Sequence, residues 1–295
     1  MNIKKNLIFF LPNFVKGGAS SAIFRLCKHL DKKKYNLFII SLNKNELKND
    51  LSKYCSEIFE INSRSVLLSS LKLTQIVKYI NNKYNFYSIF ISNIHYANII
   101  SGLCLKKNKN FKLIFFERTN ITELNLYYGV KDFLRKVVIK LLLKKIYSKA
   151  DRLISNSKQN SKEFSKICKR KFYTIYSPIE KISKFTKRKI FKNEINIVFI
   201  GRLSVEKGCE TIIKALKKLN NKDIYLDIFG DGPLEDSLKS LVKLYKLQKN
   251  VKFNGFQKIS ENKLKKFHLL VSASHFEGLP NAIAESINYN LPVVA

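Results

Sequence analysis

The stretch VFIGRLSVEKGCETIIKAL, residues 198–216, sets the fold expected of this chain. Its apolar start predicts a strand that ends at Gly201, and its second half predicts a helix that begins near Cys209. Between them, Arg202 and Lys207 flank a turn at the N-terminal end of that helix, where backbone N–H groups point outward. The stretch therefore indicates a strand–loop–helix unit suited to binding an anion, although a solvated loop in a lysine-rich chain would look the same.

The same alternation of strand and helix fills the first part of the chain. Strands are expected at residues 6–11, 36–42, 57–61, 87–94, 112–117, 152–155 and 172–176, and helices at 19–30, 66–84, 130–149 and 158–169. The strands are rich in Phe and Ile and show no polar alternation, which suits a parallel sheet covered on both faces. This pattern predicts a doubly wound α/β domain.

A second series of the same kind follows. Strands are expected at residues 195–200, 224–229, 251–253, 269–272 and 291–295, and helices at 211–219 and 234–245. Residues 178–193 interrupt the rhythm with a run of lysines, so we expect a linker there between domains 1–177 and 194–295. Two tandem domains of this type would face a cleft at the carboxyl ends of their strands.

Composition narrows the classes of partner. Lys and Arg number 55 against 22 Asp and Glu, a net charge of +33 that suits nucleic acid, an anionic membrane surface or phosphate-bearing molecules. A general lysine bias would give the same excess, and no basic motif with interleaved aromatic residues indicates nucleic acid. The 5 cysteines never form a CxxC pair, which argues for a reducing compartment. No apolar run approaches the roughly 18 residues of a membrane span, so we expect a cytoplasmic chain.

Two further stretches supply candidate site residues. LDIFGDGPLEDSL, residues 226–238, predicts a tight strand-to-helix turn at Gly230 that would let a nucleotide approach the backbone, or a turn with no further use. FEGLPNAIAESINYNLPVVA, residues 276–295, places Glu277 in a loop and Glu285 in the helix that follows. The two carboxylates could perform glycoside hydrolysis, accept hydrogen bonds from hydroxyl groups of a sugar and a ribose, or lie on the surface.

Together these residues carry a resemblance. The motifs are GRLSVEKG, GDGP, VKFNGF and FEGLPNAIAE in that order, preceded by LPNFVKGGASSAIFRL (11–26), NIHYANI (93–99), FFERTN (115–120) and LISNSKQNSKEF (153–164). In this order and spacing the chain resembles the retaining glycosyltransferases of the GT-B fold, family 4, typified by bacterial surface-polysaccharide enzymes. The resemblance covers nearly the whole chain and implies an N-terminal acceptor domain and a C-terminal donor domain, both Rossmann-like.

The resemblance implies roles for the candidate residues of the donor domain. Arg202 and Lys207 match the pair that neutralises the donor diphosphate and stabilises it as the leaving group. Glu277 matches the first glutamate of the E-x7-E motif, near the hydroxyls of the transferred sugar, and Glu285 matches the second, on the ribose. Nucleotide contacts are also expected near Gly230, Gly255 and Phe256.

In the first domain the implied roles are looser. Gly17 and Gly18 match a glycine loop that lets backbone amides approach donor phosphates and acceptor. His95 follows the fourth strand, where the family often places a histidine in the cleft, but a packed or surface histidine would look alike. Arg118 could contact the acceptor or merely cap a helix.

The activity implied is transfer of a sugar from a nucleoside-diphosphate donor, with UDP the expected nucleotide, to a lipid-linked glycan at the inner face of the cell membrane. The cation pair would replace a metal ion, and the sequence contains no Asp-x-Asp metal motif. The alternatives are another nucleotide-sugar enzyme of this fold, such as an epimerase, and an inactive nucleotide-binding remnant. Because family members continue beyond the position of Ala295, the resemblance also implies a second domain cut short.

One segment predicts a membrane contact. In VKDFLRKVVIKLLLKKIYSK, residues 130–149, Lys136, Lys140 and Lys144 recur as one stripe, and Leu134, Val137 and Leu141 form another. An interfacial helix needs such segregation, whereas an ordinary helix that covers the sheet would also be apolar on one side. The segment thus leaves both possibilities open.

Overall fold

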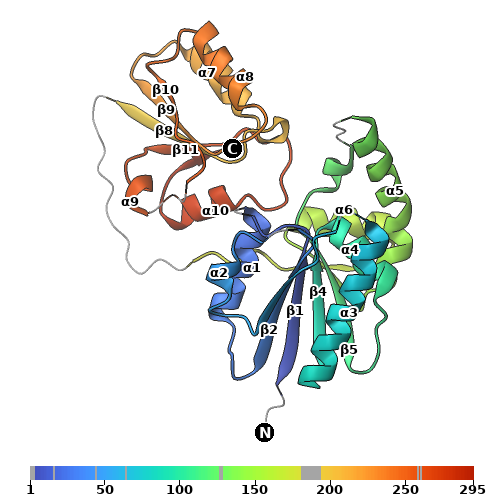
Figure 1. The fold of residues 1–295 in the computed structure, drawn as a ribbon. Coiled ribbons are helices and arrows are strands. Elements are labelled where there is room, and N and C mark those ends of the chain that lie inside the picture. Colours follow the sequence, from blue (N-terminus) through green and yellow to red (C-terminus); the bar gives the residue numbers. More distant parts are fainter. Residues whose placement is uncertain are drawn as a thin grey trace. The chain divides into compact units, whose positions relative to one another are not determined.

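The structure, a computed structural model, describes residues 4–15, 17–43, 45–63, 65–125, 129–180, 194–257, 259 and 261–295. The chain divides into two compact units, Met1–Pro178 and Ile179–Ala295. Of the linker expected at residues 178–193, positions 181–193 lie outside the described residues. Figure 1 shows both units, and each is considered by itself below.

The first unit is built on a parallel sheet. Its strands are β1 (Lys5–Leu11), β2 (Tyr35–Ser41), β3 (Glu57–Glu60), β4 (Ser88–Asn93), β5 (Phe111–Glu117), β6 (Arg152–Ser155) and β7 (Phe172–Thr174). Its helices are α1 (Gly18–His29), α2 (Lys48–Leu51), α3 (Val66–Tyr84), α4 (His95–Cys104), α5 (Val130–Tyr147) and α6 (Lys158–Cys168), with a 3-10 turn η1 (Ile121–Asn125). Among the described residues the strand order is β3-β2-β1-β4-β5-β6-β7.

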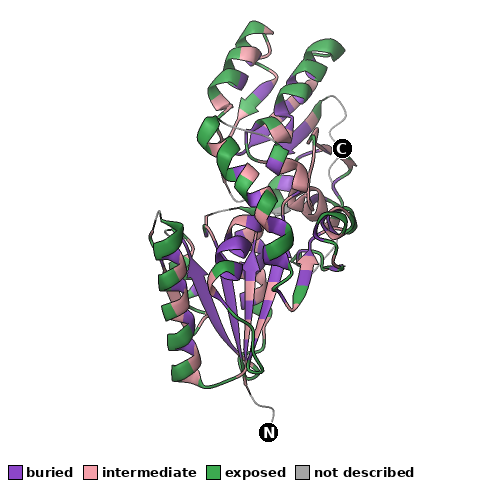
Figure 2. Ribbon diagram, turned by 90° about the vertical axis from the view of Figure 1, so that its right-hand side faces the viewer, coloured by how far each residue is buried: buried purple, intermediate pink, exposed green. Residues whose placement is uncertain are grey.

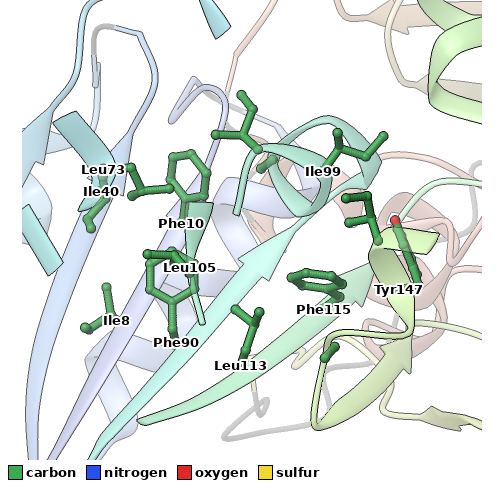
Figure 3. Packing of buried hydrophobic residues seen from close by; sticks show 14 of the residues in the cluster. Ile8, Phe10, Ile40, Leu73, Phe90, Ile99, Leu105, Leu113, Phe115 and Tyr147 are labelled. Atoms are coloured by element: carbon green, nitrogen blue, oxygen red, sulfur yellow. The ribbon is translucent and has the colours of Figure 1, made fainter. Parts of the chain in front are cut away.

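The strands of this sheet are apolar on both faces, which is why helices cover both. In β1, Ile8 and Phe10 pack into one core cluster together with residues of α3, α4, α5 and α6, while Leu7 and Phe9 pack into another with residues of α1 and α2. Successive side chains of a strand point to opposite faces, so an unbroken apolar run serves two cores at once. Figure 3 shows the first cluster, and Figure 2 shows the first sheet's strands mainly buried.

The second unit repeats this plan on a smaller sheet. Its strands are β8 (Ile195–Ile200), β9 (Ile224–Phe229), β10 (Val251–Phe253), β11 (Leu269–Val271) and β12 (Val293–Val294). Its helices are α7 (Cys209–Leu219), α8 (Glu235–Leu244), α9 (Glu261–Leu264) and α10 (Asn281–Asn288), with a 3-10 turn η2 (Val205–Lys207). Among the described residues the order is β10-β9-β8-β11-β12, all pairs being parallel. The predicted α/β class, with two doubly wound parallel sheets, is confirmed.

Two local features differ from the sequence prediction. Helix α4 is absent from it, because Ile94 precedes the helix with a φ of 73° and no side chain caps the first turn. In α5, Lys136 is buried and pairs with Asp132 at 2.9 Å, so it does not belong to an exposed stripe with Lys140 and Lys144. The helix turns Ile139 into the core instead. The predicted cationic stripe is therefore wrong at Lys136.

Each sheet has one boundary between neighbouring strands from which successive strands are added first toward one side of the sheet and then toward the other. In the first sheet this is the boundary between β1 and β4, and in the second it is the boundary between β8 and β11. Ligands of open parallel sheets bind at such positions, beyond the carboxyl ends of the strands. The topology therefore places the candidate residues that follow β1, β4, β8 and β11 where ligands of such sheets bind. No helix among the described residues combines the length and the apolar character that crossing a membrane would require.

Candidate functional site

In the second unit, backbone contacts join the loops that follow β8, β9 and β11. Gly208 has a φ of +63°, and a Cβ there would lie 1.9 Å from the carbonyl oxygen of Ala273. Gly230 has a φ of +147°, and a Cβ there would lie 1.8 Å from the carbonyl oxygen of Gly201. Only glycine fits both the backbone conformation and the space. The three loops are therefore held against one another by their main chains.

This packing brings Lys207 and Glu277 into contact. Lys207 ends η2 after β8, and Glu277 lies in the loop after β11, 70 positions along the chain. The Lys207 ammonium donates to Glu277 Oε1, which also accepts a hydrogen bond from Ser274 Oγ at 3.0 Å. The two charged side chains keep 26% and 23% of their surface exposed. The pair is thus open to solvent and to a ligand.

The other predicted residues of this unit lie around the same edge. Arg202 is exposed and makes no ion pair within the described part of the chain. Glu285 is half-buried in α10, about one turn beyond the start of that helix. Gly255 accepts a hydrogen bond from the Gly230 N–H at 2.9 Å, and the exposed Phe256 follows it. The structure therefore joins Lys207 to Glu277 directly, places Arg202, Gly255 and Phe256 just after strands of the sheet, and places Glu285 in the helix that follows the Glu277 loop.

Chemically, this edge offers a partly exposed cation–carboxylate pair and an exposed guanidinium. An ion pair exposed to this degree is worth about 1 kcal/mol or less, so a doubly charged phosphate could displace Glu277 from Lys207 at little cost. Displacement would leave the Glu277 carboxylate to accept hydrogen bonds from hydroxyl groups. Hence one ligand that carries both a diphosphate and a sugar would satisfy both side chains.

In the first unit, the glycine loop after β1 leaves room at its surface. Gly17 has extended backbone, with a φ of −173°, and a Cβ there would meet only the Val15 carbonyl oxygen at 3.9 Å. Gly18 begins α1. Neither the conformation nor the described neighbours of Gly17 require glycine, so any requirement would come from a ligand.

His95 opens α4 on a strained turn. Ile94, a β-branched residue in the left-handed region, aims the chain into the helix. The imidazole is buried, with Nδ1 lying 3.5 Å from Thr119 Oγ1 and 4.0 Å from Glu117 Oε2. Burial, followed by the charges of Lys136 and Arg135, lowers the pKa of His95 to about 4. His95 is therefore neutral at pH 7.

Glu117, which the sequence analysis did not single out, lies wholly buried at the end of β5. Its Oε1 accepts hydrogen bonds from Asn98 Nδ2 at 2.7 Å and from the Tyr147 hydroxyl. Burial raises the pKa of Glu117 to about 8, although the hydrogen bonds from Tyr147 and Asn98 act to lower it, as does the backbone N–H of His95. A carboxyl group that ends an otherwise apolar strand, FKLIFFE, is the signal that could have identified it.

Arg118 is a buried cation with neutral partners. Its Nε donates to Asn93 Oδ1 at 2.9 Å, and a second nitrogen donates to Ser177 Oγ at 3.3 Å. The guanidinium carbon lies 4.0 Å from the ring centre of Phe116. Burial lowers the pKa of Arg118 to about 10, so the charge persists at pH 7. Such a charge suits an anionic group of a ligand.

Comparisons with known proteins agree with this architecture. Residues 180–295 match the family described as glycosyl transferases group 1. An uncharacterized glycosyltransferase of Methanocaldococcus jannaschii is 31% identical over a region that covers 67% of this chain and 51% of that protein. In Campylobacter jejuni, N-acetylgalactosamine-N,N'-diacetylbacillosaminyl-diphospho-undecaprenol 4-alpha-N-acetylgalactosaminyltransferase is 31% identical over 56% of this chain and 46% of that enzyme.

A solved structure extends the match over both units. The crystal structure of Anabaena HepE in complex with UDP and glucose superimposes with a TM-score of 0.75 at 16% identity, over 98% of this chain and 80% of that one. The present chain spans about half the length of the two curated relatives it matches. The chain has the GT-B fold, and residues 180–295 match the family described as glycosyl transferases group 1.

Proposed function

We propose that this chain is a retaining glycosyltransferase of family 4 that moves a sugar from a UDP-linked donor to a lipid-linked glycan in bacterial surface-polysaccharide synthesis. The observation that carries the proposal is the contact between Lys207 and Glu277, with the exposed Arg202 in the same loop after β8 as Lys207. It unites a phosphate-binding cation and a hydroxyl acceptor at the carboxyl edge of a parallel sheet. The UDP complex of HepE and the undecaprenol-linked acceptor in the name of the Campylobacter enzyme support the two substrate classes.

In the proposed reaction the second unit binds the donor. Lys207 leaves Glu277 for the diphosphate, and Arg202 adds a second positive charge, so the negative charge that develops on the leaving group is stabilised. Glu277 then holds the sugar hydroxyls, and Glu285 holds the ribose. The cations perform the work of a metal ion, and transfer proceeds without one. In the first unit, Gly17 and Gly18 offer backbone amides to the donor phosphates and the acceptor, His95 serves the transferred group, and Arg118 serves the nucleotide or the acceptor.

UDP binding tests the donor site. Calorimetric titration of the full chain with UDP should give one site per chain, with an affinity that falls as salt rises and that is unaffected by a chelator. Lys207→Ala should weaken binding by about tenfold, as expected for loss of one charge-assisted contact. Lys214→Ala, which removes an exposed lysine of α7 paired with Glu210, is the matched control and should bind like wild type.

The stereochemical outcome tests the reaction type. With an α-linked UDP-sugar and an acceptor, NMR of the product should show an α-linkage. A β-linked product, or UDP affinity that is equal in the Lys207→Ala and wild-type chains, would overturn the proposal.

The lipid-linked acceptor implies peripheral contact with an anionic membrane at its cytoplasmic face. Although Lys136 is buried, α5 keeps Leu134, Val138 and Leu141 exposed, and Lys144 and Lys145 are exposed beside them. Apolar side chains next to cations suit the boundary between headgroups and acyl chains. Cosedimentation should show binding to anionic vesicles that salt weakens. Leu141→Glu should reduce this binding, and equal recovery with neutral and anionic vesicles would contradict it.

A further inference from the structure

A polar cluster of five residues lies around the carboxyl end of β5 in the first sheet, and four of the five are buried. We call it the Glu117 cluster, and its members are His95, Asn98, Glu117, Thr119 and Tyr147. Three elements and one loop supply them: the first turn of α4, the end of β5, the residues just after β5, and the last turn of α5. Such a cluster inside an apolar layer must satisfy its own hydrogen bonds.

The hydrogen bonds in the cluster indicate where the Glu117 proton lies. Asn98 Nδ2 and the Tyr147 hydroxyl both donate to Oε1, so Oε1 acts as the acceptor atom of the carboxyl group. Oε2 is buried and has no hydrogen-bond partner among the described residues. Burial also keeps the carboxyl group protonated at pH 7. The proton therefore belongs on Oε2, the oxygen that faces His95.

His95 presents Nδ1 to this proton. Nδ1 is 4.0 Å from Glu117 Oε2, about 1 Å beyond hydrogen-bond distance, and 3.5 Å from Thr119 Oγ1, so the proposed bond requires the two side chains to approach by that amount. The charged groups around the ring discourage a second proton on it, since Lys136 and Arg135 of α5 both act on His95. Asp132 pairs with both of these cations, and Glu123 of η1 acts on Glu117 from the other side.

We propose that protonated Glu117 is a positioning residue that donates from Oε2 to His95 Nδ1 and thereby fixes the imidazole as its Nε2–H tautomer. His95 Nε2, on the far side of the ring, is not among the fully buried unpartnered atoms of the described residues. It is then a hydrogen-bond donor toward the transferred group or the acceptor, and not a general base. The role of this donor in catalysis rests on the proposed function, whereas the tautomer itself does not.

A pH-dependent reversal follows from this arrangement. When Glu117 ionises, near pH 8, its carboxylate accepts a hydrogen bond, and the proton of His95 moves to Nδ1. Nε2 then becomes an acceptor and can no longer donate to a substrate. The same carboxyl group thus sets the tautomer on both sides of the transition.

NMR of the full chain labelled with 15N-histidine tests the tautomer without any substrate. The chain has 4 histidines, and His95→Gln identifies the resonances of His95 by their loss. We expect Nε2–H at pH 7 and a change to Nδ1–H around pH 8. Nδ1–H at pH 7, or a single tautomer across the whole range, would overturn the proposal.

Two variants change the transition in opposite ways. In Glu117→Gln the amide NH₂ takes the place of the Oε2–H and cannot ionise, so His95 should stay Nε2–H at high pH. Tyr147→Phe removes a hydrogen bond that favours the ionised carboxylate, so the transition should move to higher pH. Thr119→Val, which removes the other polar group near Nδ1 but no ionisable one, is the matched control and should leave the transition in place. A transition that disappears in Thr119→Val but persists in Glu117→Gln would assign the effect to Thr119 instead.

Transfer assays then test the consequence. Wild-type transfer should fall about tenfold per pH unit above the transition, whereas Glu117→Gln should keep its rate there. A tautomer change seen by NMR with no effect on transfer would refute the role of His95 as donor but leave its tautomer assigned. A chain that binds no UDP would refute the proposed function alone.

Discussion

The two sheets have the same topology, but the charged side chains at the carboxyl ends of their strands differ in exposure. At the β8–β11 edge, Lys207 and Glu277 keep about a quarter of their surface exposed and neutralise each other. At the carboxyl end of β5 in the first sheet, Glu117 and Arg118 are buried, and burial dominates the pKa of each. An exposed pair can exchange partners with a ligand at little cost, whereas burial shifts the pH at which a group changes its protonation state. The second unit is thus suited to capture charge and the first to orient hydrogen bonds.

The largest effect expected from this contrast is at Lys207. Lys207→Ala should reduce the transfer rate by about 10²-fold or more, because one donor that stabilises the leaving group is lost. Thermal unfolding should be unchanged, since the ion pair is partly exposed. Lys214→Ala should match wild type in both measurements. Near-wild-type turnover in Lys207→Ala would contradict the electrostatic role proposed for the β8–β11 edge of the second sheet.

The next largest effect concerns the rigidity of that edge. Gly230→Ala should lower the free energy of unfolding by about 3 kcal/mol, because its Cβ would lie 1.8 Å from the Gly201 carbonyl oxygen. Gly255→Ala also has a positive φ, of 65°, but no atom lies within 4 Å of its Cβ, so about 1 kcal/mol is expected.

In the first unit, Gly17→Ser should leave stability unchanged, since serine is a good N-cap. Urea unfolding measures all three glycine variants. If Gly230→Ala and Gly255→Ala lower the free energy of unfolding equally, the cost comes from the positive φ at both positions and not from close packing at Gly230.

Glu117 should make stability depend on pH. The unfolded chain releases this proton near pH 4.5, the folded protein near pH 8, so the free energy of unfolding falls as pH rises between these values. The decline is about 1.4 kcal/mol per pH unit. His95 contributes in the opposite direction, because its neutral folded form loses stability as pH falls from 6.5 toward 4. The two contributions offset each other between pH 4.5 and 6.5, and the decline remains above pH 6.5.

Urea titrations at several pH values measure this decline. Glu117→Gln should abolish it above pH 6.5, whereas Glu210→Gln, at an exposed position of α7, should keep it. If Glu117→Gln and wild type lose stability in parallel, the carboxyl group of Glu117 is ionised in the folded protein, and the contrast between the two edges fails.

The smallest effect expected is on UDP affinity at Glu277. Glu277→Gln removes the competitor for Lys207, so UDP should bind about threefold more tightly, the scale of a partly exposed ion pair, while transfer slows. The pH–rate profile should keep its shape in Glu277→Gln and in Glu285→Gln, since neither residue shuttles protons in the proposed reaction. Loss of a whole limb of the profile in Glu277→Gln would favour acid/base chemistry.

The sequence predicted the elements of the fold well because its local signals agree with the tertiary structure. Apolar runs of strand length, such as β1, lie between amphipathic helices, and β1 is buried on both faces. Helix α4 escaped prediction because Ile94 supplies an unusual backbone conformation in place of a cap. Lys136 is buried because the packed face of α5 is set by contacts with the sheet, and a stripe of lysines does not reveal this face.

The candidate site was predictable only in part. The motifs that resemble the family include Lys207 and Glu277, but their contact arises because β8 and β11 are neighbours in the sheet, an adjacency that sequence order does not give. The Glu117 cluster depends on burial by α5, which brings Tyr147 to within reach of a residue 30 positions earlier. Protonation states that depend on such packing cannot be read from the order of residues alone.

The contacts among the loops after β8, β9 and β11 also limit how donor specificity can be re-engineered. The main chain at Gly208 touches that at Ala273, and the main chain at Gly230 touches that at Gly201, so each loop forms part of the wall of another. The loop after β8, transplanted from a relative, would meet two unfamiliar neighbours at backbone contact distance. The exchangeable module is the set of three loops together. Individual side-chain changes are better directed to exposed positions such as Phe256, where no such wall is shared.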